Sequence, residues 1–395
     1  MFMFFGEKLT QLRELNGLSR KELADKLTIS EQAVWQYETD NLVPRIEILN
    51  QIKTLFSVDT KFFFQTTFIE PVVSEEHVAY RAKDRDSRKK TKLELTYLDY
   101  VDYYINYFEK FLVTPTSSIT KLQLQIKPFL HSSKFVEDIP RSIAKIASYS
   151  RQSLQLHHNK DLMYVLESSG IYILEKDLGT EIDAYSVITK HNRSFIILGS
   201  LKKTAVRRNF DLAHELGHLL MHEDIDMESL TKKEHREIEH QANLFAADFL
   251  LPEEEFTADF AELQRKSNPD SYLDLKRKYL VSIAAMGYHA YQLGLMNYQE
   301  NRYFYGQLTK KKYKTFEPLD DEIVPIKPGR VKSLLQLIYK KQVLAVPDLS
   351  NIFHIIPSFL VKLFNLNPDF FDEYVAPKPD YFSATNIISI DKFRN

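Results

Sequence analysis

The residues best suited to chemistry in this 395-residue chain are His214, Glu215 and His218. Two histidines four residues apart lie about one helical turn apart, so both imidazoles project from one helix face and can share a metal ion. A glutamate directly after the first histidine can accept a proton from a water that the metal activates. The pattern therefore predicts a zinc site with Glu215 as general base.

A hydrolytic zinc site needs a third protein ligand and leaves the fourth position open for water. Because the chain has no cysteine, this ligand must come from a histidine or a carboxylate. We expect Glu239, with Asn243 one turn later placed to hold the imidazole of a ligand. The alternatives for the third position are His222, Glu228, His235 and His240. Among them, His222 lies one turn beyond His218 and is expected at the rim.

A motif of five residues also occurs by chance, so its surroundings matter. Gly217 lies inside the expected helix, where glycine costs about 0.5–1 kcal/mol relative to alanine and is usually tied to close packing. Apolar spacing predicts two helices between residues 210 and 251, with an acidic loop at 223–228 and Pro252 ending the second helix. These helices would position the metal site.

Two apolar runs, residues 170–174 and 194–198, are typical of strands. In zinc peptidases an edge strand beside the active helix aligns the substrate backbone by strand addition. We expect residues 195–199 to be that edge strand, with an ordinary buried strand as the alternative.

Residues 208–222 and 239–252 together resemble the ImmA/IrrE family of bacterial and phage metallopeptidases, and the resemblance extends from about residue 140 to about residue 330. It implies that His214, His218 and Glu239 bind one Zn²⁺ per chain and that Glu215 is the catalytic base. It also implies a substrate class, a repressor or antitoxin-like protein whose cleavage switches transcription in a stress or mobile-element response. The alternative is a regulator that cuts nothing and uses this domain as a sensor, but an intact Glu215 favours the peptidase.

The chain departs from the family pattern at one downstream motif. The family usually has arginine after the tyrosine of this motif, whereas here Tyr288 is followed by His289. Both residues are candidates for stabilising the transition state, because a histidine can donate a hydrogen bond to a developing oxyanion. Packing is the alternative role for both.

A second specific pattern lies near the N-terminus, where residues 18–38 read as a helix, a short turn and a second helix. Ser19 and Ser30 stand where N-caps are expected. Over residues 6–64 the segment resembles the Cro/C1-type (XRE) repressors, which place the start of the second helix in the major groove of an operator. Palindromic operators would also favour a homodimer.

The residues expected on the DNA side of this domain are Arg20, Glu31, Gln32, Trp35, Gln36 and Asn41. We assign Arg20 and Asn41 to phosphate, while Trp35 would touch either a thymine methyl group or a protein. Residues 1–64 contain eight Lys or Arg and nine Asp or Glu, so the affinity for DNA should be modest and sensitive to salt. Docking of a protein is the alternative role for this domain.

Composition sets outer limits on the function. The net charge of −2 gives no overall attraction to nucleic acid or to anionic membranes. No apolar run approaches the roughly 18–20 residues that span a bilayer, and the start of the chain lacks the features of a secretion signal. With no cysteine, the chain fits a reducing compartment, so we expect a cytoplasmic protein with no membrane partner.

We expect an α+β fold that is mainly α, in which an all-α domain precedes a zincin-like peptidase domain with a small sheet and a helical C-terminal region. The expected parts are a helix-turn-helix domain at 1–66, a basic hinge and helical connector at 67–130, the peptidase domain at 131–310 and a helical cap or sensor at 311–395. Within the connector, residues 81–92 hold seven Lys or Arg against two Asp, which is typical of a solvated hinge. A strip facing nucleic acid and a site of self-cleavage are the alternatives there.

Overall fold

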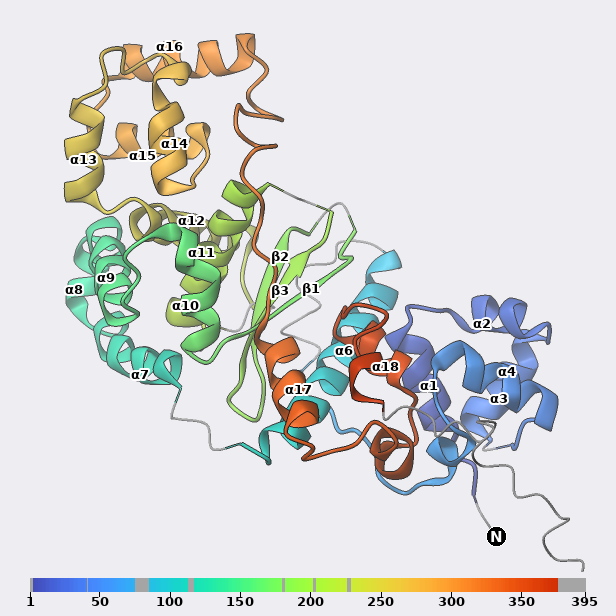
Figure 1. The fold of residues 1–395 in the computed structure, drawn as a ribbon. Helices are drawn as coiled ribbons and strands as arrows, with labels where there is room; N and C mark the ends of the chain where they lie inside the picture. The colour runs from blue at the N-terminus through green and yellow to red at the C-terminus, as the bar shows by residue number, and fades with distance from the viewer. Residues whose placement is uncertain are drawn as a thin grey trace, which may run out of the picture.

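The computed structural model describes residues 3–40, 42–74, 85–112, 117–179, 182–201, 204–225 and 229–375. These residues form a mainly helical protein around one three-stranded sheet (Figure 1), which confirms the expected α+β, mainly α class. Among them, no helix combines the length and the apolar character needed to cross a membrane.

The N-terminal domain consists of short helices separated by tight turns. They are α1 (Gly6–Leu15), α2 (Arg20–Leu27), α3 (Glu31–Thr39), α4 (Ile46–Phe56) and the 3₁₀ turn η1 (Thr60–Phe64). The Ser19 hydroxyl accepts a hydrogen bond from the Glu22 amide and forms a capping box, and Ser30 caps α3 through the Ala33 amide. Both predicted N-caps are confirmed.

Helix α6 (Arg85–Glu109) follows and packs against this domain. Near its start, Lys89 Nζ lies 2.6 Å from a carboxylate oxygen of Glu22, and Lys92 Nζ lies 3.4 Å from Glu14. The later part of the predicted basic hinge is therefore helical and docks on the helix-turn-helix domain. Residues 81–84, the earlier part, lie outside the described residues.

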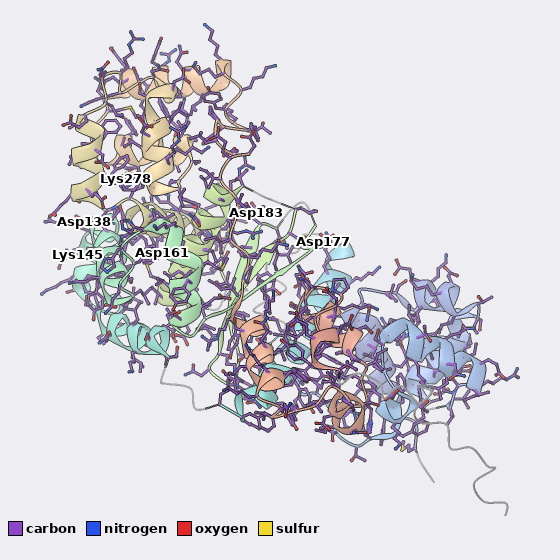
Figure 2. The ribbon with its side chains drawn as sticks, in the orientation of Figure 1. Asp138, Lys145, Asp161, Asp177, Asp183 and Lys278 are labelled. Carbon is purple, nitrogen blue, oxygen red and sulfur yellow. The ribbon has the colours of Figure 1, made fainter. Side chains whose placement is uncertain are left out.

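The helices of the central part cover one face of the sheet. They are α7 (Ser118–Leu130), α8 (Ser133–Glu137), α9 (Ile139–Ser153), α10 (Leu162–Ser168), α11 (Ala205–Met221) and α12 (Lys232–Leu250), with the short η2 (Asn159–Asp161) before α10. Helices α11 and α12 pack closely, and a Cβ added to Gly217 would lie 3.0 Å from the Phe245 ring. The glycine thus permits the close approach that the sequence suggested. Charged side chains such as Asp138 and Lys145 lie on the outside of these helices (Figure 2).

The sheet contains β1 (Tyr172–Lys176), β2 (Ala184–Ile188) and β3 (Ser194–Gly199) in the order β1-β3-β2. Strand β3 pairs with β1 in parallel and with β2 in antiparallel orientation. The expectation that residues 195–199 form the edge strand is therefore wrong, because both edges of β3 are already hydrogen-bonded. The edge strand next to α11 is β2, which the apolar pattern did not reveal.

The sheet separates two hydrophobic cores. Alternate side chains of β1 and β3, among them Leu174 and Ile197, face a core that also contains α6, the N-terminal domain and the C-terminal helices. Their neighbours Ile173 and Ile196 face a second core formed by the central helices. Because successive side chains of a strand point to opposite faces of the sheet, neighbouring residues of β1 and β3 belong to different cores.

A helical lobe extends the second core (Figure 1). It comprises α13 (Glu253–Ala261), η3 (Pro269–Tyr272), α14 (Leu273–Tyr279), α15 (Ile283–Gln292) and α16 (Tyr298–Lys310). The fully buried Lys276 ammonium lies 2.8 Å from Glu317 and 2.7 Å from Asp320. Glu317 also accepts hydrogen bonds from the Ile283 and Ala284 amides at the start of α15, so this cluster fastens the chain that leaves the lobe.

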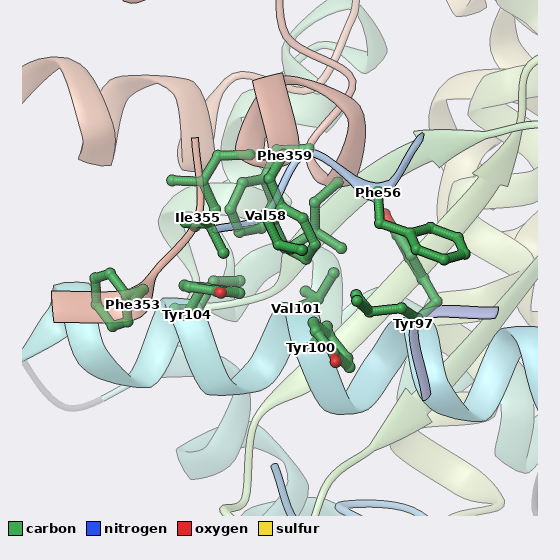
Figure 3. Packing of buried hydrophobic residues seen from close by; sticks show 14 of the residues in the cluster. Phe56, Val58, Tyr97, Tyr100, Val101, Tyr104, Phe353, Ile355 and Phe359 are labelled. Carbon is green, nitrogen blue, oxygen red and sulfur yellow. The ribbon is translucent and has the colours of Figure 1, made fainter. Parts of the chain in front are cut away.

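The C-terminal region returns to the N-terminal domain. Its elements are α17 (Arg330–Lys340), η4 (Leu349–Phe353), α18 (Pro357–Leu363) and η5 (Asp372–Tyr374). An isolated bridge pairs Val58 with Ile355, and the Asp59 amide donates to the His354 carbonyl at 2.7 Å. Figure 3 shows Phe353 and Phe359 beside the aromatic side chains of α6. The expected division into four domains stays a prediction, and the described part of the expected cap shares a core with the helix-turn-helix domain.

Candidate metal centre and DNA-facing surface

Three of the expected ligands converge between α11 and α12. The Nε2 atoms of His214 and His218 lie 3.0 Å apart. The Glu239 carboxylate lies 3.3 Å from the first and 3.5 Å from the second. One ligand atom from each residue falls within 4.8 Å of the other two, so the three side chains form a candidate metal centre.

The spacing of these atoms fits a tetrahedral zinc ion. Ligands held about 2.0–2.1 Å from such an ion lie roughly 3.3 Å from one another. Burial lowers the pKa of His214, but its hydrogen bond with Glu239 and the charges of Glu215 and Glu239 together raise that pKa above its usual value. The centre therefore favours a positive charge, and two imidazoles with one carboxylate are a donor set that suits zinc.

Each histidine has a partner on its other ring nitrogen. The Nδ1 atom of His214 lies 3.1 Å from the Asn243 side-chain oxygen, which can only accept. His214 therefore carries its proton on Nδ1 and leaves Nε2 free for a metal. This is the role expected for Asn243.

His222 lies behind His218, outside the three-residue centre. Its Nδ1 is 3.0 Å from Nδ1 of His218, and its Nε2 is 3.3 Å from the Gln241 side-chain oxygen. Because burial lowers the pKa of His222 to about 4, its ring is neutral and can accept from His218 while it donates to Gln241. His222 thus orients His218, a role that the sequence did not reveal.

Glu215 is buried beside the centre. One of its carboxylate oxygens accepts a hydrogen bond of 2.7 Å from the hydroxyl group of Ser186, which stands in the middle of β2. Sequence reasoning missed Ser186 because β2 was not predicted. Ser186 could have been found only if β2 had been predicted as the edge strand next to α11.

A cavity of about 480 Å³ adjoins the centre. Its walls come from β2 and the following turn, from the end of α11, and from residues 72–74, and His218 and Glu239 lie along it. The cavity thus connects the outer side of the edge strand with the candidate metal centre.

The other candidates for the third ligand do not join the centre. His240 is exposed on α12 and His235 is half-buried nearer its start. Neither belongs to the cluster of ligand atoms found among the described residues. Glu228 lies outside the described residues.

The structure does not place Tyr288 and His289 at this centre. Nε2 of the buried His289 donates to the Leu251 carbonyl at 3.0 Å, and Nδ1 lies 3.8 Å from Asp248. Asp248 is nine residues from Glu239 along α12, which corresponds to roughly 13 Å. Burial lowers the pKa of His289 to about 4. Burial and the charge of Glu253 raise the pKa of Asp248 to about 7. Both shifts favour the neutral forms, so they oppose an ion pair between the two side chains.

Tyr288 is partly exposed on α15 beside Tyr305. The catalytic role expected for Tyr288 and His289 therefore has no support in the geometry. His289 contacts Leu251 and Asp248 at the end of α12 and the Phe256 ring of α13, so the geometry favours the packing alternative for His289 in particular.

Four of the residues expected to contact DNA lie on α3. Glu31, Gln32 and Trp35 are exposed and Gln36 is half-buried, while Val34 and Tyr37 face the core. Contact of these side chains with a major groove stays a prediction. Asn41 lies outside the described residues.

Arg20 has an additional role inside the domain. Its Nε lies 2.6 Å from the fully buried Glu38 carboxylate, which Arg13 Nε also contacts at 2.5 Å. The carboxylate between two guanidinium groups joins α1, α2 and α3. The terminal nitrogens of the partly exposed Arg20 remain the atoms for a phosphate contact, which stays a prediction.

Comparison with protein families supports both parts of this description. Residues 166–291 match the peptidase family described as the IrrE N-terminal-like domain, and residues 9–63 match the helix-turn-helix family. The chain joins an IrrE-like domain to a helix-turn-helix domain. The candidate metal centre, Glu215 and Ser186 all fall within the IrrE-like domain.

The apo form of the competence regulator ComR from Streptococcus vestibularis is a similar solved structure. The similarity amounts to 12% sequence identity over 80% of this chain and 94% of that chain, with a TM-score of 0.17. No protein of curated function matches the chain.

Proposed function

We propose that this protein is a zinc-dependent endopeptidase coupled to a DNA-binding domain, and that it cleaves a repressor or antitoxin-like protein to switch transcription. One observation carries the proposal: two Nε2 atoms and a carboxylate converge at metal-ligand spacing beside a buried glutamate. A purely structural metal site has no need of a proton acceptor in that position.

The side chains around the centre have separate tasks. His214, His218 and Glu239 would hold the zinc ion, which when bound polarises a carbonyl group and activates water. Glu215 would accept the proton of the attacking water and pass it to the leaving amine. Ser186 donates a hydrogen bond to one oxygen of Glu215 and so holds the carboxylate in one orientation for this proton transfer.

The substrate is expected to be an extended stretch of protein chain. Strand β2 is hydrogen-bonded to β3 on one side, and its residues line the cavity that reaches the metal centre. An extended chain paired with the outer edge of β2 would bring one of its peptide bonds to His218 and Glu239. This assignment replaces β3, whose edges are both occupied.

A regulator that cuts nothing is the second candidate. The helix-turn-helix domain shares one hydrophobic core with α6, the sheet and the C-terminal helices, so a change at the metal centre can reach it without cleavage. The same core serves the peptidase equally well, and only an activity measurement separates the two.

The first experiment compares wild type with Glu239→Ala and Glu215→Gln. We expect about one zinc per chain in wild type and in Glu215→Gln, and a marked loss in Glu239→Ala, by elemental analysis. Incubation with a host lysate should then produce new protein N-termini with wild type that Glu215→Gln does not produce. Equal zinc but no difference in N-termini would favour the second candidate.

A further inference from the structure

A short segment joins the DNA-binding domain to the cavity beside the metal centre. We call residues 70–74 the strap. Just before it, the Thr67 carbonyl accepts a hydrogen bond of 2.7 Å from Lys8, and the Ile69 carbonyl accepts one of 3.3 Å from Gln11. Both donors belong to α1, so the start of the strap moves with the helix-turn-helix domain.

The strap is also fastened to the turn that follows β2. The Lys190 amide donates to the Val72 carbonyl at 2.9 Å, and the Lys190 ammonium lies 3.1 Å from Glu70. On its other side, the Val72 amide donates to the Asp99 carboxylate of α6 at 2.8 Å. Asp99 therefore fixes the position in which the strap meets the Lys190 turn.

The strap lies next to the end of β2, beside the cavity that reaches the metal centre. Val72, Val73 and Ser74 line the same cavity as Ser186, His218 and Glu239. Strand β2 ends at Ile188, two residues before the turn that the strap occupies. Because the Lys190 amide already donates to the Val72 carbonyl, a chain that follows the edge of β2 past Ile188 meets the strap.

We propose that the strap is a stop at the end of the substrate groove, so that a long extended protein chain binds fully only when the strap leaves the Lys190 turn. This inference rests on the proposed function, since it concerns the regulation of the same groove. Because α1 holds the start of the strap, movement of the DNA-binding domain changes access to the groove. Occupancy of the groove in turn changes the position of that domain.

The test uses the full chain with zinc bound and with Glu215→Gln throughout, so that nothing is cut. The long probe is fluorescein-labelled β-casein, an unfolded protein chain, followed by anisotropy. The short probe is acetohydroxamate, which binds the metal and does not reach the strap. Asp99→Ala removes the acceptor for the Val72 amide, whereas Asp99→Asn keeps an oxygen that can accept it.

We expect Asp99→Ala to bind β-casein about tenfold more tightly than the parent and Asp99→Asn to bind it as the parent does. Gln11→Ala, which cuts the bond to Ile69, should shift binding in the same direction as Asp99→Ala. Acetohydroxamate should bind all of them equally, and thermal unfolding checks that each variant is folded.

A cross-link supplies the opposite change. The chain has no cysteine, so Glu70→Cys with Lys190→Cys introduces the only two thiols, and bismaleimidoethane then holds the strap to the turn. The linked protein should lose at least fivefold in β-casein affinity relative to the unlinked double variant. Equal β-casein binding by parent, Asp99→Ala and linked protein would overturn the proposal. Failure of acetohydroxamate to bind any form would count instead against the metal centre.

Discussion

At the scale of single residues, Ser186 and Glu215 make the sharpest prediction. The Ser186 hydroxyl touches the carboxylate and not the ligand atoms, so Ser186→Ala should lower kcat about tenfold while KM and zinc content stay the same. Ser186→Thr keeps the hydroxyl and should retain most of the activity. The measurement is steady-state cleavage of the first substrate identified, and a loss of zinc in Ser186→Ala would contradict a role limited to positioning.

Asp248 makes a prediction about pH and stability. Burial and the Glu253 charge raise its pKa to about 7 in the folded protein, above the unfolded value near 4. The folded state therefore binds more protons between about pH 4 and pH 7, and this raised pKa lowers stability as pH rises through that window. Asp248→Asn should stabilise the protein by about 2 kcal/mol at pH 8, after discounting for partial exposure, and by almost nothing at pH 4.

Urea unfolding at the two pH values measures this difference. The exposed Asp161 supplies the control, since Asp161→Asn should change stability equally little at both values. A gain from Asp248→Asn that is the same at pH 4 and pH 8 would show that charge is not its cause.

The sequence predicted the residues of the centre unequally well. His214, His218 and Asn243 could be found because a spacing of four puts side chains on one helix face, and that regularity holds in any helix. Ser186 and Gln241 could not be found in this way. Their roles depend on how a strand and a second helix pack on α11, which no local spacing encodes.

At the scale of elements, two glycines make a matched pair. A Cβ added to Gly287 in α15 would lie 2.1 Å from the buried Phe304 ring, whereas one added to Gly306 in α16 would meet nothing within 4 Å. Gly287→Ala should therefore destabilise the protein by about 2 kcal/mol. Gly306→Ala should stabilise it by about 0.5–1 kcal/mol through helix propensity alone.

Both glycine variants can be compared with wild type in one set of urea unfolding curves. The opposite signs test whether α15 and α16 touch at Gly287. Stabilisation by both substitutions would mean that the two helices are farther apart than the structure has them.

The helices were easier to predict than the sheet. Capping residues such as Ser19 and Ser30 mark helix starts locally, and the structure confirms both. The order of the strands depends on long-range pairing instead. Strand β3 carries the apolar run 195–198 and is buried along its whole length, but that run does not say which strands pair with its two edges.

At the scale of the whole molecule, the shared core predicts cooperative unfolding. Phe353 packs with Tyr104 of α6 (Figure 3) in the core that also holds the helix-turn-helix domain. Its ring also contacts Tyr107 of the same helix. Phe353→Ala should cost about 3–5 kcal/mol and lower the stability of the DNA-binding domain although it lies some 300 residues away in sequence.

Trp35 makes this measurable, because it is the only tryptophan and lies on α3. Its fluorescence transition in urea should coincide with the circular dichroism transition and shift with it in Phe353→Ala. A Trp35 transition that the substitution leaves in place would show that the N-terminal domain folds independently.

The contact between the two ends of the chain was beyond sequence analysis. Both ends show helical apolar patterns, but nothing in those patterns indicates that Val58 and Ile355 pair with each other. The N-terminal boundary was found because a specific motif marks it, whereas the C-terminal helices carry only general core residues.

The bridge between Val58 and Ile355 has a practical consequence for re-engineering the protein toward a new DNA target. Replacing residues 1–66 as a cassette would leave Ile355 and the aromatic surface beneath it without their natural partner. Changing only the outward residues of α3, such as Gln32 and Gln36, leaves that contact intact. If the predicted contacts of α3 with DNA hold, the DNA target can be changed from the outer face of one helix, whereas exchange of the whole domain would remove the contact with Ile355.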